Sequence, residues 1–199
     1  MIYLELRFPF TGNSLPSDQG YGLFSALSRV IPEVHGSAWL ALETLPGIAR
    51  GDGTTQLDQH SRLKLRAPQD RIPLLLKLAG KRIDVRGHAI RLGPPQIYLL
   101  RPSSSLYARC VTIKNYTEPD PFLSAVAHKL DELGIKGEPE LGLRRAFRVG
   151  SHTIVGFGLR IHDLSDEGSI VLQEKGIGGR RHFGCGFFTP ITQVPSDGK

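Results

Sequence analysis

The chain has 199 residues, a formal net charge of +6 at pH 7 and a hydrophobic content of 40%. This length suits one large or two small domains, and the apolar content is high enough to bury a core. No run of eighteen consecutive apolar residues occurs, which argues against a transmembrane helix, and the first seven residues lack the pattern of a signal peptide.

The basic balance favours an anionic polymer as the partner. Cys110 and Cys185 are the only cysteines, so we expect no disulfide and a reducing, cytoplasmic compartment. Neither a Cys-x-x-Cys nor a His-Glu-x-x-His pattern occurs, so neither a metal nor another cofactor is expected.

The first hundred residues predict elements in the order β-α-β-β-α-β, which is that of a ferredoxin-like unit. The predicted elements are a strand over 2–8, a helix over 18–30, strands over 38–44 and 60–66, a helix over 70–79, and strands over 82–85 and 88–99. We expect Asp18 to cap the first helix and Pro32 to end it.

The same order recurs after a linker rich in serine. The predicted elements are a strand over 106–114, a helix over 120–133, strands over 141–149 and 152–161, a helix over 165–175 and a strand over 187–190. Asp120 and Ser165 are the expected caps, and Gly150-Ser151 predicts a tight hairpin. We therefore predict an α+β protein of two tandem ferredoxin-like domains. Residues 1–103 form the N-terminal domain, and residues 104–199 form the C-terminal domain with a glycine-rich loop.

That loop follows the last predicted helix and holds five glycines within eleven residues. Glycine allows positive φ angles and close approach to a ligand, and successive N–H groups can form a concave anion site. The arginine side chains match phosphate oxygens. The segment lacks both the Walker pattern and the strand-to-helix order of a dinucleotide site, and a plain connection is the alternative. The predicted phosphate contacts are Lys175, Gly176, Gly178, Gly179, Arg180, Arg181 and His182.

The strand predicted over 60–66 alternates between basic and apolar residues. Arg62, Lys64 and Arg66 would share one face and form a stripe roughly 13 Å long. Such a stripe can follow a phosphodiester backbone, although a solvated sheet face is the alternative. A second basic set comprises Arg144, Arg145 and Arg148. Aromatic residues are sparse, so we expect reading of backbone or shape, as for structured RNA.

Seven histidines could transfer protons near neutral pH. They are His35, His60, His88, His128, His152, His162 and His182. His35 differs because it follows the first helix and Pro32 in an irregular turn, and catalytic residues concentrate in loops held by a rigid scaffold. We expect the others to be structural, exposed or, for His182, phosphate-binding.

Together these features resemble the CRISPR repeat-processing endoribonucleases, an RRM/RAMP-like family. The family pattern Gly-x-Gly-x5-Gly-x-Gly lies between the last helix and the last strand. It is matched by Gly176, Gly178, Gly184 and Gly186. The resemblance covers nearly the whole chain.

The resemblance implies a metal-independent endoribonuclease that cuts CRISPR precursor RNA within each repeat to give mature guide RNAs. The 2′-hydroxyl would attack the adjacent phosphate and leave a 2′,3′-cyclic phosphate and a 5′-hydroxyl. The family's catalytic histidine maps by position onto His35. Secondary candidates near it are Tyr21, Ser37, His60, Ser61 and Lys64. The alternative is a non-catalytic RNA-binding subunit of a CRISPR effector complex. In either case the partner is CRISPR repeat RNA, as precursor or guide, and no membrane is involved.

Overall fold

The computed structural model describes residues 2–58, 60–149 and 152–191. The predicted Gly150-Ser151 hairpin and residues 192–199 lie outside the described residues. The chain forms two compact units. Unit 1 comprises Met1–Leu100, Phe147–Ile154 and Arg180–Cys185, and unit 2 comprises Arg101–Ala146, Val155–Gly179 and Gly186–Lys199. The predicted domain boundary between 103 and 104 stays a prediction.

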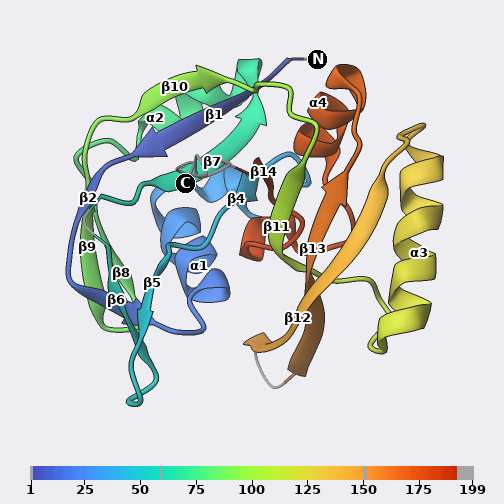
Figure 1. Cartoon of the computed structure of the whole chain (residues 1–199). Coiled ribbons are helices and arrows are strands. Elements are labelled where there is room, and N and C mark those ends of the chain that lie inside the picture. The colour runs from blue at the N-terminus through green and yellow to red at the C-terminus, as the bar shows by residue number, and fades with distance from the viewer. Residues whose placement is uncertain (1, 59, 150–151, 192–199) are drawn as a thin grey trace, which may run out of the picture. The chain divides into compact units, whose positions relative to one another are not determined.

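Unit 1 is built on an antiparallel four-stranded sheet. Its strands, in spatial order, are β10 (Gln96–Leu99), β1 (Tyr3–Phe8), β7 (Leu63–Pro68) and β4 (Ala41–Leu42). Figure 1 shows β1 between β10 and β7. In chain order this is fourth, first, third and second, which is the order of a ferredoxin-like sheet and confirms that prediction.

Helix α1 (Gly20–Val30) supplies much of the apolar side of unit 1. Its residues Leu23 and Leu27 are buried in one cluster with Leu6 of β1 and Leu65 of β7. The helix stops before Pro32, as predicted, and a 3₁₀ turn follows, η1 (Pro32–Val34).

Two small antiparallel sheets extend unit 1, and most of their strands were not predicted because they are very short. One contains β2 (Phe10–Thr11), β9 (His88–Leu92) and β8 (Arg82–Val85), and the other contains β3 (Ser14–Pro16), β6 (Thr54–Leu57) and β5 (Gly47–Ala49). The helix predicted over 70–79 is shorter than expected. It consists of a 3₁₀ turn, η2 (Gln69–Arg71), and α2 (Ile72–Leu76).

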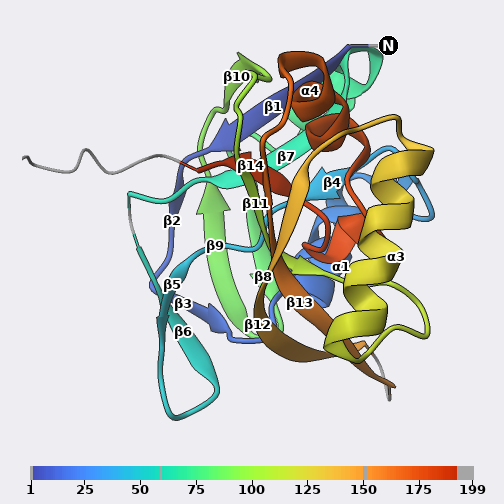
Figure 2. The same ribbon diagram turned by 45° about the vertical axis from the view of Figure 1, so that its right-hand side comes forward.

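Unit 2 contains a second antiparallel four-stranded sheet. Its strands, in spatial order, are β12 (Glu138–Val149), β13 (His152–His162), β11 (Leu106–Val111) and β14 (Phe188–Pro190). Helices α3 (Pro119–Glu132) and α4 (Asp166–Lys175) complete the ferredoxin-like set (Figure 2). Phe122 of α3 packs against Phe157 of β13 with 4.8 Å between the ring centroids, so the helix is anchored on the sheet through an aromatic pair.

The helix caps differ in part from expectation. Ser165 caps α4 as predicted, because its hydroxyl accepts a first-turn N–H at 3.0 Å. Asp18 does not cap α1, since Gln19 occupies the cap position. Asp120 lies in the first turn of α3, whose cap is Glu118. In the part of the chain that the structure describes, no helix has the length and apolar character needed to cross a bilayer.

Candidate active site

A pocket of about 500 Å³ runs along helix α1 of unit 1. Its lining residues are Tyr21, Phe24, Ser25, Ser28, Arg29, Pro32 and His35. The helical ones recur three or four positions apart and so share one face of α1. His35 follows η1, and its backbone N–H donates to the Pro32 carbonyl at 3.0 Å. The structure thus brings the predicted residues His35 and Tyr21 into one pocket.

Several aromatic rings pack in a cluster around Phe24, one of the residues that line the pocket. The His35 ring stacks near Phe24, with centroids 6.4 Å apart and an interplanar angle of 23°. The His182 ring lies 4.7 Å from the same Phe24 ring, and Phe183 lies 5.4 Å from it. Phe183 also meets Tyr21 edge-on at 5.5 Å. Residues from the glycine-rich loop and from α1 therefore pack together within unit 1.

The loop reaches α1 through a tight turn, η3 (Arg181–Phe183). Arg180 and Gly184 flank it with positive φ angles of 61° and 91°. Gly20, at the start of α1, allows the close approach, because a Cβ there would lie 2.1 Å from the Phe183 carbonyl oxygen. A Cβ on Gly184 would lie 2.5 Å from Thr44 Cγ2. Both glycines are therefore needed to seat the turn.

The glycines of the loop are mainly structural. Four of their amides donate to backbone carbonyl oxygens of this chain, at distances between 2.8 and 3.3 Å. They belong to Gly176, Gly179, Gly184 and Gly186. Gly178 has a φ of 79°, and a Cβ there would lie 2.1 Å from the Thr112 carbonyl oxygen. The predicted cradle of free amides is thus wrong at these four positions, because internal hydrogen bonds already use the donors.

The two histidines of the cluster differ in environment. His35 is exposed and His182 is partly buried. Burial lowers the pKa of His182, and the positive charges of Arg180 and His35 lower it further. Within the described part of the chain, neither imidazole hydrogen-bonds another protein group. Their ring nitrogens are therefore not engaged in hydrogen bonds within the described part of the protein.

The segment before β7 departs from the predicted strand over 60–66. The strand begins only at Leu63, so His60, Ser61 and Arg62 precede it. Asp58 organises this segment by accepting the His60 N–H at 2.9 Å, and Arg62 donates to the His60 and Ser61 carbonyl oxygens at 2.8 Å. The strand thus starts three residues later than predicted, and none of His60, Ser61 and Arg62 lines the pocket.

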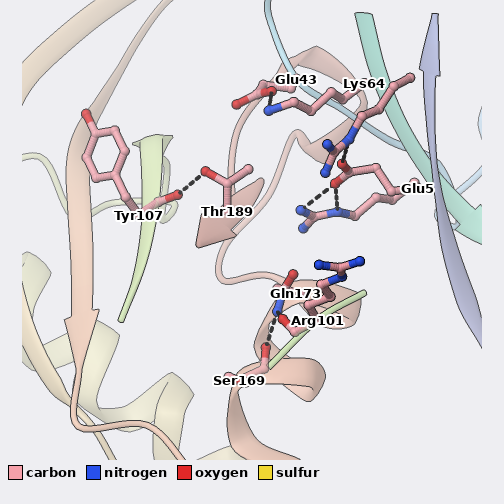
Figure 3. A network of polar contacts seen from close by, with 10 residues as sticks. Glu5, Glu43, Lys64, Arg101, Tyr107, Ser169, Gln173 and Thr189 are labelled. Carbon is pink, nitrogen blue, oxygen red and sulfur yellow. Dashed lines mark hydrogen bonds and ion pairs between the residues drawn. The ribbon is translucent and has the colours of Figure 1, made fainter. Parts of the chain in front are cut away.

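The remaining cations of the predicted stripe form ion pairs (Figure 3). Arg66 is only 1% exposed, and its Nη2 and Nε lie 2.7 and 2.9 Å from one carboxylate oxygen of Glu5, its cross-strand neighbour. Arg7 contacts the other oxygen at 2.6 Å. Lys64 pairs with Glu43 at 2.8 Å. The prediction that Arg66 faces RNA is wrong, because β7 lies inside the sheet and this side chain is covered.

This network also sets the ionisation of its carboxylate. Burial raises the pKa of Glu5, but the charges and hydrogen bonds of Arg66 and Arg7 outweigh it, so the net pKa lies below the ordinary value. Glu5 is therefore ionised at neutral pH and holds Arg66 in place.

The other predicted RNA contacts are distributed over both units. Arg144 and Arg148 of β12 are exposed, and Arg145 is partly buried. The Arg148 backbone N–H donates to Asp18 at 2.6 Å, so one oxygen of this carboxylate is engaged outside helix α1. The alternation along β12 thus leaves two of the three arginine side chains exposed to a ligand.

Near the loop, Lys175 is exposed at the end of α4, and Arg180 is partly buried. Burial lowers the pKa of the Arg181 guanidinium, and its interaction with Tyr3 of β1 opposes this effect. Arg181 is thus occupied within unit 1. Ser37 follows His35, but its hydroxyl donates to the Val34 carbonyl at 2.8 Å.

Comparison with known proteins identifies the family to which the chain belongs. The family described as Cas6 Crispr matches residues 4–193. The chain belongs to the Cas6 family of CRISPR-associated endoribonucleases. A CRISPR-associated endonuclease Cas6 from Myxococcus xanthus (strain DK1622) is 37% identical over 202 residues, covering 100% of this chain and 87% of that relative.

Solved structures of the Cas6 type share the fold. A Cas6-related protein from Pyrococcus furiosus is 12% identical, covers 96% of this chain and 99% of its own, and superposes with a TM-score of 0.65. Thermus thermophilus Cse3 bound to an RNA representing a pre-cleavage complex is 15% identical and superposes with a TM-score of 0.56. The match covers 95% of this chain and 98% of the Cse3 chain. At these identities the likeness confirms the duplicated ferredoxin-like fold.

Two parts of this candidate site were missed by sequence reasoning. Neither Phe24 nor Gly20 stood out in the sequence as a site residue. The signals that could have found them are the pair Gly20-Tyr21 at the start of the helix and the aromatic pair His182-Phe183 inside a glycine-rich segment. Neither signal reveals by itself that the two segments meet.

Proposed function

We propose that this chain is a metal-independent endoribonuclease that cuts CRISPR precursor RNA within its repeats and releases mature guide RNAs. Membership of the Cas6 family and the similarity to the CRISPR-associated endonuclease Cas6 of Myxococcus xanthus support the substrate class. The single observation that carries the assignment to this chain is the pocket along α1, with the exposed imidazole of His35 in its lining. In this proposal the 2′-hydroxyl attacks the adjacent phosphate and leaves a 2′,3′-cyclic phosphate and a 5′-hydroxyl.

The pocket offers groups suited to this chemistry. In-line transesterification needs a proton acceptor, a proton donor and positive charge near the phosphorane. His35 carries an imidazole, the side chain that serves most often as a general acid or base in enzymes. Arg29, whose side chain is anchored on the Asp84 carbonyl at 2.7 Å, lines the pocket and can offset developing negative charge. The Tyr21 hydroxyl is a further hydrogen-bond donor there.

We propose that the RNA backbone is held by cations outside the pocket. The proposed contacts are Arg62, Arg144, Arg148, Lys175 and Arg180. Arg66 and Arg181 are left out because their side chains are engaged inside unit 1. We further propose that residues 1–103 and 104–199 act as two domains in the cytoplasm, where Cys110 and Cys185 stay reduced and form no disulfide.

The test is cleavage of a repeat RNA under single-turnover conditions in EDTA. Wild-type protein should give one discrete cut, the upstream product should end in a cyclic phosphate, and a 2′-deoxy nucleotide at the cut should block the reaction. His35→Ala should slow cleavage on the order of 10²–10⁴-fold with little change in affinity. His128→Ala, on the exposed side of α3, is the matched control.

Two results would contradict the proposal. RNA that is bound but never cut would favour the non-catalytic subunit of an effector complex. Cleavage that stops in EDTA and returns with magnesium would indicate a metal-bound water as the nucleophile.

A further inference from the structure

We infer that His182 is the second proton-transfer group of this site and works as a pair with His35. This inference rests on the RNA cleavage proposed above and adds a residue from the glycine-rich loop to the chemistry. The loop would then do more than hold the RNA backbone, because its η3 turn would carry one half of an acid–base pair.

Geometry is the first support. His182 and His35 come from different elements, yet both imidazoles lie against the ring of Phe24, at 4.7 and 6.4 Å between centroids. Their centroids are therefore within about 11 Å of each other, roughly one Debye length. In-line transfer places the attacking and leaving oxygens on opposite sides of phosphorus, so the acceptor and the donor must be separate groups several ångströms apart. Two imidazoles that share one aromatic support meet this requirement.

Hydrogen bonding is the second support. His88 and His162 each hydrogen-bond neighbouring side chains, as is usual for a structural histidine. Among the described residues, His35 and His182 have no such partner, and only ring contacts hold them. Packing thus orients each ring while its nitrogens remain able to exchange a proton with substrate.

The turn that carries His182 is also held firmly. Its ring lies 4.1 Å from Phe183, which packs edge-on against Phe24. Gly20 gives the turn room at the start of α1, as described above. A side chain that only followed the RNA backbone would not need this support, whereas proton transfer requires a fixed position.

The surroundings suggest which proton each group moves. The charged groups that act on His182 are Arg180 from its own loop and His35 from the end of η1, while α1 presents the uncharged Phe24. Together with burial they lower the pKa of His182 and favour its neutral form, which can accept a proton.

In this scheme, His182 takes the proton of the 2′-hydroxyl as the new bond from the 2′-oxygen to phosphorus forms. The bond from phosphorus to the 5′-oxygen breaks, and that oxygen takes a proton from His35. The two protons balance, and no other reactant is needed.

The experiment compares single-turnover cleavage by wild type, His182→Gln, His182→Phe and His35→Gln, with His128→Gln as the control. Both His182 variants should be slower on the order of 10²–10⁴-fold at saturating protein, with nearly unchanged RNA affinity. His182→Phe keeps an aromatic ring against Phe24, so it should fold as wild type does. Loss of His182 should also remove the limb of the pH–rate profile that rises with pH.

A modified substrate separates the two roles. When sulfur replaces the leaving 5′-oxygen, the leaving group needs no proton, so His35→Gln should regain most of its lost rate. His182→Gln should stay slow because the 2′-hydroxyl proton must still be removed. Rescue of the His182 variant instead would overturn its assignment as the acceptor.

The outcomes distinguish a failure of the proposed RNA cleavage from a failure of the role assigned to His182. A wild-type protein that leaves repeat RNA intact would overturn the proposed function and this assignment with it. A wild-type protein that cuts, together with folded His182 variants that cut equally fast or are slowed only through weaker binding, would overturn the role of His182 alone.

Discussion

The substitution Arg66→Met should destabilise unit 1 and leave RNA binding intact. Arg66 and Glu5 are 1% and 3% exposed, and two guanidinium nitrogens lie within 2.9 Å of one carboxylate oxygen. Removing one partner of such a buried pair costs about 3–5 kcal/mol. Arg7 remains 2.6 Å from the other oxygen, so we expect the lower end of that range, about 3 kcal/mol. For a chain of this length that is roughly 6–12 °C in Tm.

The assay is thermal or urea unfolding of wild type, Arg66→Met, and Glu5→Leu/Arg66→Met. The double variant should be closer to wild type than the single one, because no buried charge is left unpaired. The folded-state pKa of Glu5 lies below its ordinary value of 4.5, so its stabilising effect is present above that pH and is lost as the pH falls through the folded value. The stability gap between wild type and Arg66→Met should therefore narrow in acid.

RNA binding provides the opposing test. If Arg66 contacted a phosphate, its removal would lower the slope of log affinity against log salt by about 1. An unchanged unfolding midpoint combined with such a loss of slope would refute the buried ion pair and restore the basic stripe that the sequence predicts.

Three further predictions concern the loop and the pocket. Gly20→Ala should slow cleavage and lower the melting temperature, because its Cβ would lie 2.1 Å from a carbonyl oxygen of η3. The control is Gly51→Ala, whose Cβ would meet open space. Equal behaviour of the two variants would contradict the packing of the turn against α1. Arg180→Ala should weaken RNA binding and reduce the salt slope by about 1, and an unchanged slope would remove it from the RNA contacts. In His35→Ala the pKa of His182 should rise, because a positive charge that lowers it is gone. The pKa is measured from the chemical shifts of the imidazole nitrogens as a function of pH. An unchanged pKa would show that the charge of His35 does not act on His182.

Local signals in the sequence were sufficient for most of unit 2. The helix predicted over 165–175 is α4 (Asp166–Lys175), because Ser165 caps it and Gly176 ends it with a φ of 64°. The strand predicted over 152–161 is β13 (His152–His162). Caps, glycine stops and alternation act over a few residues, so they can be read without knowing what lies across the sheet.

Signals of the same kind were weaker in unit 1. Its short strands, such as β2 (Phe10–Thr11) and β3 (Ser14–Pro16), have too few residues to show a period. Asp18 has the side chain of a helix cap but accepts the backbone N–H of Arg148 instead, a partner far away in the sequence. Propensity states what a residue can do locally, and tertiary contacts decide which option is used.

The sequence by itself determined the ferredoxin-like order of elements and the glycine pattern of the family, because both depend on residues that are close together along the chain. It also named His35 as a candidate, which stays a prediction. Only the tertiary structure decided that Arg66 pairs with Glu5 inside the sheet and that His182 meets Phe24. Alternation shows which residues share a face of a strand but not whether that face is covered. A glycine-rich loop shows that the backbone can turn but not against which helix it packs.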